Sequence, residues 1–389
     1  MISVAEALAQ LFSLVRPMET EEIPLVSASG RTLARAVSAK RDQPPFPSSA
    51  MDGYAVADAA PGMTFTVIGE SAAGHRFDRA VAEGQAVRIF TGAPVPAGAT
   101  HVVIQEDVTR DGDLITVGNR LDQGANIRPA GTDFAENARF DAPKTLNPFD
   151  IALLASMNVA RVPVARKPKV ALISTGDELV MPGETPGPDQ IIVSNTFGLH
   201  ALLSANGAAP RILPIARDNK DSLRHAFSLI DDADLVITIG GASVGDHDLV
   251  APVAAELGMD RAFHKVAMRP GKPLMSGRLA ETMMIGLPGN PVSAMVCGQV
   301  FVLPVIRAML GLPRQAAPRR SALLKDALPA NGNREHYMRA ILDTDGLRAA
   351  TRQDSSLLSV LSGANALLVR PVDDPAREVG ERVEYIPLN

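Results

Sequence analysis

The spacing of apolar residues divides the chain into regions with different periods. Apolar residues recur three and four positions apart from Ser3 to Val15 and again from Leu146 to Val159, which predicts two amphipathic helices. Between them, from Phe65 to Arg139, short β-like runs alternate with Gly, Pro and Asp, which predicts a small all-β module. Because helical segments flank this module on both sides, we expect it to be inserted into a helical domain that is discontinuous in sequence.

After residues 161–168, which we interpret as a linker, strand-like and helix-like segments alternate. This alternation predicts a parallel sheet with right-handed crossovers. The expected strands are 170–175, 211–216 and 234–240, and the expected helices are 194–207 and 221–233. Two more β-like runs, 272–279 and 282–288, precede a long apolar helix over 292–310. We expect that helix to be buried and to kink at Pro304.

A second linker over 312–318 precedes the C-terminal region. From there to the end, short β-like runs are separated by turn sequences such as Ala330-Asn-Gly332 and Thr344-Asp-Gly346. This pattern predicts a small terminal β domain.

Composition narrows the class of protein. A chain of 389 residues exceeds the size at which one core stops growing, so we expect two to four domains. With 46% hydrophobic and 21% charged residues, the chain has the composition of a soluble globular protein. We see no apolar stretch typical of a membrane span and no signal peptide at the N-terminus, so we expect a cytoplasmic protein without a membrane partner.

Charge and cysteine usage exclude other classes. The net charge is −5 and no Lys/Arg-rich block interleaved with aromatic residues occurs, so we expect no nucleic-acid partner. Cys297 is the only cysteine, which excludes an intramolecular disulfide and any site that needs several thiolates.

Five glycine-rich or charged segments each follow a β-like run, and ligands of open α/β sheets bind beyond the carboxyl ends of the strands. Glycines in such segments let the backbone approach phosphate-like anions. The segments are 174–178, 216–218, 240–248, 269–273 and 286–291, with glycines at Gly176, Gly240, Gly241, Gly245, Gly271 and Gly289. One such glycine alone is an ordinary turn; five segments together favour a binding site.

Charged side chains fall in the same segments. Asp177, Glu178, Asp218, Asp246 and Asp248 supply carboxylates, the usual ligands of Mg²⁺. For Asp218, next to Asn219 at a helix start, capping is as good an interpretation as function. Lys265, Arg269 and Lys272 add positive charge that suits a polyanion. Upstream, Asp52 lies in a proline-rich loop that by itself reads as a surface turn.

Six motifs, in this order and spacing, resemble the molybdopterin molybdenumtransferases, the MoeA family that also supplies the E domain of gephyrin. They are PPFPSSAMDGYA, RIFTGAPVPAGA, ALISTGDEL, ITIGGASVGDHD, RPGKP and GLPGNPVS. The resemblance covers nearly the whole chain. It implies an L-shaped homodimer with four domains per subunit, one of them an α/β domain shared with the adenylyltransferases of the same pathway. It also implies a reaction in which adenylylated molybdopterin and molybdate yield molybdenum cofactor and AMP, with Mg²⁺ supporting the phosphates.

The resemblance also implies roles for individual residues. The expected catalytic residues are Asp52, Glu178, Asp248 and Lys265, with Glu178 and Asp248 as the metal ligands. Asp52 would complete the site of the neighbouring subunit. The expected substrate-binding residues are Thr91, Arg128, Thr175, Gly176, Asp218, Gly240, Gly241, Ser243, Arg269, Gly271, Lys272, Pro288, Gly289, Asn290, Pro291 and Ser355. Arg269 stands where many relatives have lysine, and Thr132 stands where an acid usually follows the glycine.

The expected fold is a multidomain α/β and β protein. Its parts are a central parallel-sheet α/β/α domain similar to that of the adenylyltransferase MogA, an inserted β domain, a discontinuous helical N-terminal domain and a small C-terminal β barrel. The expected boundaries are, respectively, 166–313; 27–41 with 55–139; 1–26 with 42–54 and 140–165; and 314–389.

Two rival functions stay open at this point. The α/β domain alone would suit molybdopterin adenylyltransferase, the preceding enzyme and a possible contact partner, although stand-alone adenylyltransferases lack the upstream motifs. A binding scaffold like gephyrin is the other alternative. The residues do not decide which carboxylate acts as the base, or whether tungstate competes with molybdate.

Overall fold

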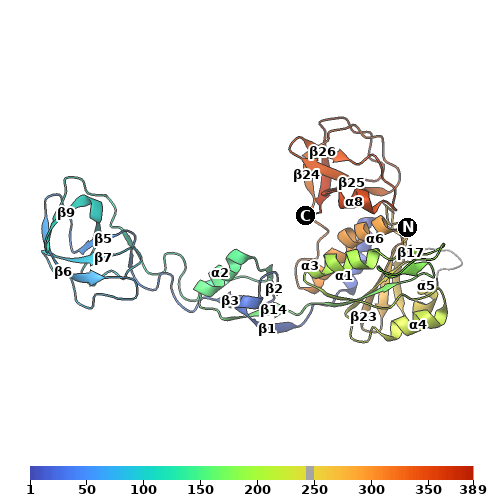
Figure 1. Cartoon of the computed structure of the whole chain (residues 1–389), viewed down its shortest axis with the longest axis horizontal. Helices are drawn as coiled ribbons and strands as arrows, with labels where there is room; N and C mark the ends of the chain where they lie inside the picture. The colour runs from blue at the N-terminus through green and yellow to red at the C-terminus, as the bar shows by residue number, and fades with distance from the viewer. Residues whose placement is uncertain (242–248, 389) are drawn as a thin grey trace. The chain divides into compact units, whose positions relative to one another are not determined.

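A computed structural model describes residues 1–241 and 249–388, and it forms two compact units (Figure 1). Unit 1 comprises Met1–Glu21, Gly30–Ala34 and Val164–Asn389, and unit 2 comprises Glu22–Ser29 and Arg35–Pro163. The chain passes between the units within β1 (Thr20–Pro24), after Ser29, after Ala34 and within β14 (Arg161–Ala165).

Unit 2 contains the expected β module as a six-stranded sheet in the order β8-β5-β7-β6-β10-β9. Tyr54, Val56, Phe65 and Ile115 pack into its core. A Cβ on Gly53 would lie 2.0 Å from the Val103 carbonyl oxygen, so only glycine fits between β5 and β8 there. The strands are β5 (Gly53–Val56), β6 (Thr64–Ser71), β7 (Gln85–Ile89), β8 (His101–Ile104), β9 (Val108–Asp111) and β10 (Leu114–Val117).

The rest of unit 2 consists of short elements. The helix expected over 146–159 is α2 (Pro148–Ser156), which begins at an Asn147–Asp150 capping box. Two strand pairs join distant segments, β3 (Val37–Ser38) with β12 (Arg139–Phe140) and β4 (Ser48–Ser49) with β11 (Ile127–Arg128). The other elements are η1 (Leu25–Ser27), η2 (Gln105–Asp107) and β13 (Lys144–Thr145).

Unit 1 is built on a six-stranded sheet in the order β18-β15-β19-β23-β22-β20. The first four strands are parallel, as the alternation of elements predicts. The strands are β15 (Lys169–Ser174), β18 (Ala209–Ile212), β19 (Leu235–Ile239), β20 (Asp260–His264), β22 (Met275–Leu279) and β23 (Thr282–Leu287).

The last two pairings of the sheet, β23 with β22 and β22 with β20, are antiparallel, so β22 runs opposite to the other strands, which the expected parallel sheet did not include. Only Ala280 and Glu281 separate β22 from β23. A connection this short can join antiparallel neighbours only, because a parallel crossover needs a dozen or more residues. Both runs were expected as strands, and the two-residue connection between them in the sequence already excludes a parallel pair.

Both faces of the sheet are covered, because alternate residues of each strand enter different cores. Val170 and Leu172 join the core beneath α1 (Val4–Leu14) and α3 (Asn195–Ala205). Ala171 and Ile173 join the core beneath α4 (Lys220–Ser228) and α5 (Val250–Glu256). Figure 1 shows α4 and α5 together at one side of the sheet.

The first helix differs from the expected grouping. We assigned residues 1–26 to a domain with the segment that forms α2, yet α1 packs in unit 1, where Val4, Leu8 and Leu11 enter the core of the α/β part. Residues 27–41 likewise contribute β2 (Thr32–Leu33) and β3 rather than strands of the six-stranded sheet of unit 2. Amphipathic spacing shows that a helix has an apolar face but not which core receives it. The four domain boundaries stay a prediction.

The long apolar helix is buried as expected and carries an irregular turn. It consists of α6 (Pro291–Cys297), the π-helical segment η3 (Gly298–Val302) and α7 (Leu303–Met309). The wider π turn ends at Val302, two residues before Pro304, which has no N–H to donate to the preceding turn. Among the described residues, this is the helix with the length and apolar character of a membrane span, but 78% of its apolar window is buried inside unit 1.

The C-terminal part of unit 1 is the expected small barrel, drawn in orange to red in Figure 1. Hydrogen bonds join β24, β28, β27, β25 and β26 in turn, and a bridge from Leu347 to Leu324 closes the circuit. The short strand β21 (Met268–Arg269) adds to β25 from outside. The elements are β24 (Arg320–Leu323), β25 (Glu335–Asp343), β26 (Gly346–Ala349), α8 (Leu358–Ser362), β27 (Ala366–Arg370) and β28 (Arg382–Pro387).

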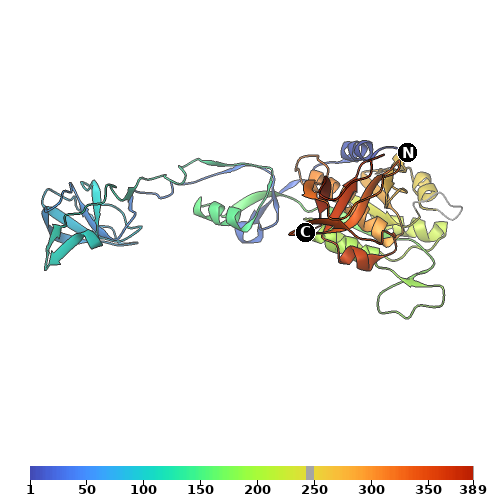
Figure 2. The same cartoon turned by 90° about the horizontal axis from the view of Figure 1, so that it is seen from above.

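A long loop leaves the α/β sheet after β15. Its ends form a two-stranded ladder, β16 (Leu179–Val180) with β17 (Ile191–Ile192). Figure 2 shows the green loop between these strands extending from the body of unit 1. The exposed Ile191 and Ile192 therefore lie where the loop ends, shortly before α3 begins.

Candidate functional site

A cavity of about 570 Å³ lies at the carboxyl ends of β15, β19 and β23. All five segments that the sequence analysis singled out reach it, the fourth through Pro273. Of the expected site residues, the cavity is lined by Thr175, Gly176, Glu178, Asp218, Gly240, Gly241, Pro288, Gly289, Asn290 and Pro291. Adjacent parallel strands end at one edge, which is why segments distant in sequence meet here.

Three strand ends approach one another through glycine. Gly240 has φ +95, and a Cβ there would lie 2.8 Å from both the carbonyl and the hydroxyl oxygen of Thr175. A Cβ on Gly289 would lie 3.6 Å from the Gly240 Cα, an ordinary contact. The hydroxyl of Thr175 is buried and has no hydrogen-bond partner among the described residues. Closely spaced backbone at Gly240 and Gly289 and the unsatisfied Thr175 hydroxyl thus form one part of the cavity lining.

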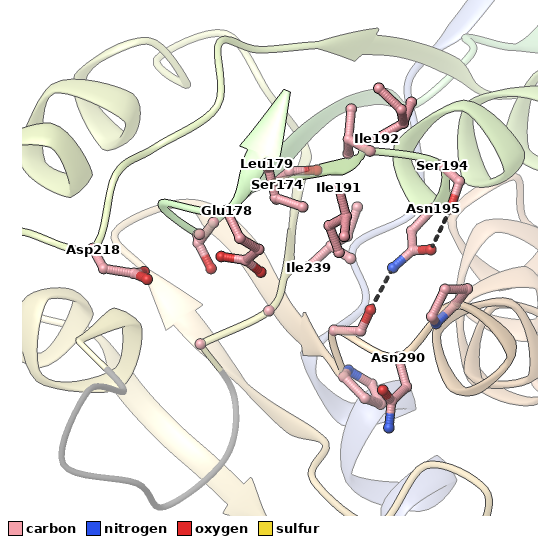
Figure 3. A pocket seen from close by; sticks show the side chains of 18 of the residues that line it. Ser174, Glu178, Leu179, Ile191, Ile192, Ser194, Asn195, Asp218, Ile239 and Asn290 are labelled. Carbon is pink, nitrogen blue, oxygen red and sulfur yellow. Dashed lines mark hydrogen bonds between the residues drawn. The ribbon is translucent and has the colours of Figure 1, made fainter. Parts of the chain in front are cut away.

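Two carboxylates lie on one side of the cavity (Figure 3). The Glu178 carboxylate folds over Gly176, where a Cβ would lie 2.4 Å from its Oε2. Asp218 and Asp177 bind reciprocally, since the Asp218 amide donates to Asp177 Oδ1 (3.1 Å) and the Asp177 amide donates to Asp218 Oδ2 (3.4 Å). The helix cap itself is Asn219, whose side chain accepts from the Ser222 amide. Asp218 is therefore not needed for capping.

Amide side chains lie opposite these carboxylates (Figure 3). Asn195 Nδ2 donates to the Gly289 carbonyl (2.7 Å), and Ser194 donates to Asn195 Oδ1 (3.2 Å). Asn290 Nδ2 donates to the Ser355 hydroxyl (3.1 Å), and the Val292 amide donates to the Ser355 carbonyl (3.0 Å). The proline-rich turn is thereby held from the α3 side and from the barrel. From the sequence, Ser194 and Asn195 were expected only to begin the helix over 194–207.

The cationic segment, residues 265–273, contributes Pro273 to the lining of the cavity, whereas Lys265, Arg269, Gly271 and Lys272 are not among the lining residues. Lys265 is half-buried and has φ +82, a left-handed conformation that is uncommon outside glycine. Arg269 and Lys272 are exposed. Gly271, expected to bind substrate, has φ +111 and packs against Cys297, whose Sγ would lie 2.5 Å from an added Cβ. This close packing by itself explains why position 271 is a glycine, without a role in substrate binding.

Two buried cationic or titratable side chains next to this segment escaped the sequence analysis. Arg339, in β25, is fully buried, and its Nε and Nη1 have no hydrogen-bond partner among the described residues, while Nη2 donates to the Asp354 carbonyl (3.0 Å). His336 is 8% exposed, and its Nε2 likewise lacks a partner in the described chain. The sequence did offer a signal for both residues, because each is a charged or titratable residue within the otherwise apolar run of β25.

The upstream motif of unit 2 forms a separate polar cluster. Both the amide and the hydroxyl of Thr91 donate to Asp52 Oδ1, each at 2.7 Å. The side-chain bond, then the backbone bond, holds the pKa of Asp52 below its usual value, with a smaller contribution from Arg88. Asp52 is therefore a fixed anion. Arg128, exposed in β11, lines another cavity of about 930 Å³ together with Arg41 and Thr132.

Several expected residues are not brought to the cavity of unit 1 by contacts within the described chain. Asp52, Thr91 and Arg128 belong to unit 2, and each unit is described by itself. Ser243 and Asp248 lie outside the described residues. Ser355 reaches the cavity through Asn290.

The residues present fit a Mg²⁺ ion that shares its ligands with a substrate. No cluster of three or more His, Cys, Asp or Glu side chains with metal-binding geometry occurs in ranges 1–241 and 249–388. Glu178 and Asp218 nevertheless line one cavity. Mg²⁺ in phosphoryl-transfer sites is bound by one or two carboxylates, waters and the substrate phosphates, so a cage of protein ligands is not required.

Comparison with known proteins covers the whole chain. Residues 2–158 match the MoeA N-terminal region (domain I and II), residues 171–308 a probable molybdopterin binding domain, and residues 321–388 the MoeA C-terminal region (domain IV). The molybdopterin molybdenumtransferase of Nostoc sp. is 36% identical over 100% of this chain and 94% of its own length. That of Haemophilus influenzae is 34% identical over 96% of this chain and 95% of its own.

Solved structures agree. The moeA protein of Pyrococcus horikoshii OT3 has a TM-score of 0.86 at 28% identity, with 99% of both chains covered. The three matched regions follow one another along the chain in the expected order and cover its N-terminal, central and C-terminal parts. The chain belongs to the MoeA family.

Proposed function

We propose that this protein is a molybdopterin molybdenumtransferase, which inserts molybdenum from molybdate into adenylylated molybdopterin and releases AMP. The observation that carries the proposal is the cavity at the carboxyl ends of β15, β19 and β23, lined by two carboxylates and by the turn that Asn195 and Ser355 hold. The similarity of the whole chain to molybdopterin molybdenumtransferases supports adenylylated molybdopterin as the ligand of this cavity.

The backbone of the cavity suits the pterin phosphates. Glycine at 240 and 289 lets a phosphate approach the chain closely, and Arg269 and Lys272 supply positive charge from the adjoining segment. Asn195 keeps the turn before α6 in place rather than binding substrate itself, because its amide is already engaged with Gly289.

Glu178 and Asp218, with Asp248 from outside the described residues, hold Mg²⁺ in this proposal. The ion would neutralise the phosphates and favour cleavage of the phosphoanhydride. The Glu178 carboxylate, which lies over Gly176, either orients a water or binds the ion; both roles require its charge.

Molybdate is a dianion and needs a cationic site apart from these acids. We assign this role to Lys265 and Arg269. Arg339, in the strand paired with β21, adds Nε and Nη1 donors that have no partner among the described residues. Buried donors of this kind are usually satisfied by a water or an ion. We therefore propose that molybdate binds near the junction of β21 with β25 of the barrel.

We also propose that the protein acts as a homodimer in which Asp52 of one subunit completes the site of the other, and that it receives its substrate by contact with the adenylyltransferase. The support for a shared site is that Asp52 is a fixed anion in unit 2, whereas the cavity belongs to unit 1.

The test is formation of AMP from adenylylated molybdopterin, with and without molybdate and Mg²⁺. Glu178→Gln is expected to lower the molybdate-dependent rate by at least ~100-fold, the typical contribution of one acid, base or charge-stabilising group. Glu184→Gln is the matched control, because Glu184 lies on the same loop but bonds the Met181 amide and does not line the cavity.

Two outcomes would contradict the proposal. Molybdate-independent AMP release by the unmodified protein would remove molybdenum insertion as the reaction. Synthesis of adenylylated molybdopterin from ATP and molybdopterin would assign the adenylyltransferase activity instead.

A further inference from the structure

The ladder of β16 and β17 gives the cavity an apolar wall, which consists of Leu179, Ile191 and Ile192. Ile191 is paired with Leu179 in this ladder, and all three residues line the cavity (Figure 3). Neighbouring strands lie only about 4.8 Å apart, so the side chains of a paired position present one joint surface. The apolar wall adjoins Glu178, which directly precedes Leu179 and lines the same cavity.

Much of the apolar wall is not covered by the protein itself. Leu179 is buried, as is Ile239 in another part of the lining, whereas 57% of Ile191 and 39% of Ile192 are exposed. Single exposed apolar residues are common on protein surfaces. Two of them in a cavity that also holds polar groups are typical of a ligand site, where apolar side chains provide contact area and a few polar groups fix the orientation.

Hydrogen bonds hold the apolar wall in place without a ligand. The Ile191 amide donates to the Glu178 carbonyl (2.8 Å), so β17 is joined directly to the residue that carries the carboxylate. Arg217 Nη1 donates to the Leu179 carbonyl (3.2 Å) on the other strand. A surface that is already fixed loses little conformational entropy when a ligand binds to it.

We propose that the apolar wall binds the face of a planar heteroaromatic ring of the substrate, the adenine or the pterin of adenylylated molybdopterin, with Ile191 as the main contact. The inference rests on the proposed function, which supplies this substrate. The phosphates and the ribose are polar, so the two ring systems offer the apolar faces that the wall can cover. Both rings are joined to the diphosphate by short spacers, so a diphosphate beside Glu178 brings one of them to Ile191.

Ile191 determines specificity in this proposal and takes no part in the chemistry. The glycine backbone and the charged groups recognise a phosphate of any compound, whereas the apolar wall makes the affinity depend on the ring. A phosphate ester without a ring is therefore expected to bind more weakly than one that carries a ring.

The experiment is calorimetric titration of the whole protein with AMP, with molybdopterin and with ribose 5-phosphate, which has the sugar and phosphate of AMP but no ring. Ile191→Ala removes three carbon atoms from the apolar wall. Since one methylene in an apolar pocket is worth about 10-fold or more, we expect this variant to bind the ligand whose ring uses the wall at least ~10-fold more weakly. Its affinity for ribose 5-phosphate should stay the same.

Two further variants serve as controls. Ile191→Leu keeps the apolar surface and should retain most of the affinity. Ile341→Ala is the matched control, because Ile341 is an isoleucine of β25 that is 48% exposed and does not line this cavity.

The affinities identify the ring. A loss for AMP assigns the apolar wall to adenine, and a loss for molybdopterin assigns it to the pterin. Unchanged affinities for both, or an equal loss for ribose 5-phosphate, would overturn the inference. Dissociation of a dimer in Ile191→Ala, measured by light scattering, would also overturn it, because a second subunit would then cover the wall.

NMR of the unmodified protein tests the contact directly. A ring stacked on Ile191 shifts the resonance of its δ1 methyl group upfield, which AMP or molybdopterin should do and ribose 5-phosphate should not. A bound ligand that leaves this resonance in place would overturn the inference alone. If the protein bound neither AMP nor molybdopterin, the proposed function would fail, and this inference with it.

Discussion

At the scale of single residues, the functional groups are held by backbone donors and close glycine contacts more than by ion pairs. Asp52 illustrates this, since one residue, Thr91, supplies both of its hydrogen bonds. Charge-assisted bonds of this kind stabilise the ionised carboxylate relative to the neutral acid.

The first residue-scale prediction concerns this pair. Thr91→Val removes the hydroxyl donor but leaves the backbone donor, so the pKa of Asp52 is expected to rise toward the usual value of about 3.9. A carboxyl whose folded pKa is depressed contributes stability above its unfolded pKa and loses it as the pH falls through the folded pKa. The substitution therefore moves that loss to higher pH, within the range below about pH 4.

NMR titration of the Asp52 carboxyl carbon measures this shift. Thr100→Val is the control, because the Thr100 hydroxyl donates to the Ala57 carbonyl and not to a carboxylate. An Asp52 pKa that stays the same in Thr91→Val would show that the backbone bond alone sets it.

At the scale of elements, the cationic segment is fixed by packing against the long helix. Gly271 lies against Cys297 of α6, and the segment continues into β21 of the barrel. The buried cysteine, its pKa raised by burial, is thus a packing residue rather than a nucleophile.

Gly271→Ala is expected to lower the free energy of unfolding by about 1–3 kcal/mol, because the new methyl group collides with Cys297 Sγ and the left-handed backbone disfavours alanine. Gly311→Ala is the control for the second cause, since Gly311 has φ +83 but no atom within 4 Å of an added Cβ. It should cost about 1 kcal/mol. Urea unfolding measures both, and equal losses would exclude a role for the Cys297 contact.

Elements and candidate segments were predictable where a local pattern determines them. The parallel strands, the buried apolar helix and the barrel follow from period and turn sequences, and the five loops follow from parallel strands ending at one edge. The core that receives α1 was not predictable, because an apolar stripe does not identify its partner. Arg339 was missed for a similar reason, since its importance comes from unsatisfied donors that only three-dimensional packing reveals.

At the scale of the whole molecule, the proposed chemistry is distributed over two units. Asp52 and Arg128 belong to unit 2, and Glu178 and the cationic segment to unit 1. A homodimer allows each site to take its residues from different chains.

This arrangement predicts complementation between inactive variants. Asp52→Asn and Glu178→Gln are each expected to be inactive, but after subunit exchange a mixed dimer contains one site with neither substitution. Random pairing of equal amounts should restore about a quarter of the unmodified activity, measured as AMP formation. Light scattering verifies that dimers form. Absence of any recovery in verified mixed dimers would place both carboxylates in the site of a single chain.

The contact between Ser355 and the proline-rich turn links the start of α6 to the C-terminal part of unit 1. Asn290 directly precedes α6, but its side chain donates to Ser355 and does not cap the helix. The Val292 amide belongs to the first helical turn, where amides lack a partner within the helix, and it donates to the Ser355 carbonyl. The C-terminal part of unit 1 thus caps the N-terminus of a helix that belongs to the α/β part. A chain without its C-terminal part would leave the Val292 amide without this acceptor, so the start of α6 depends on residues more than sixty positions further along the sequence.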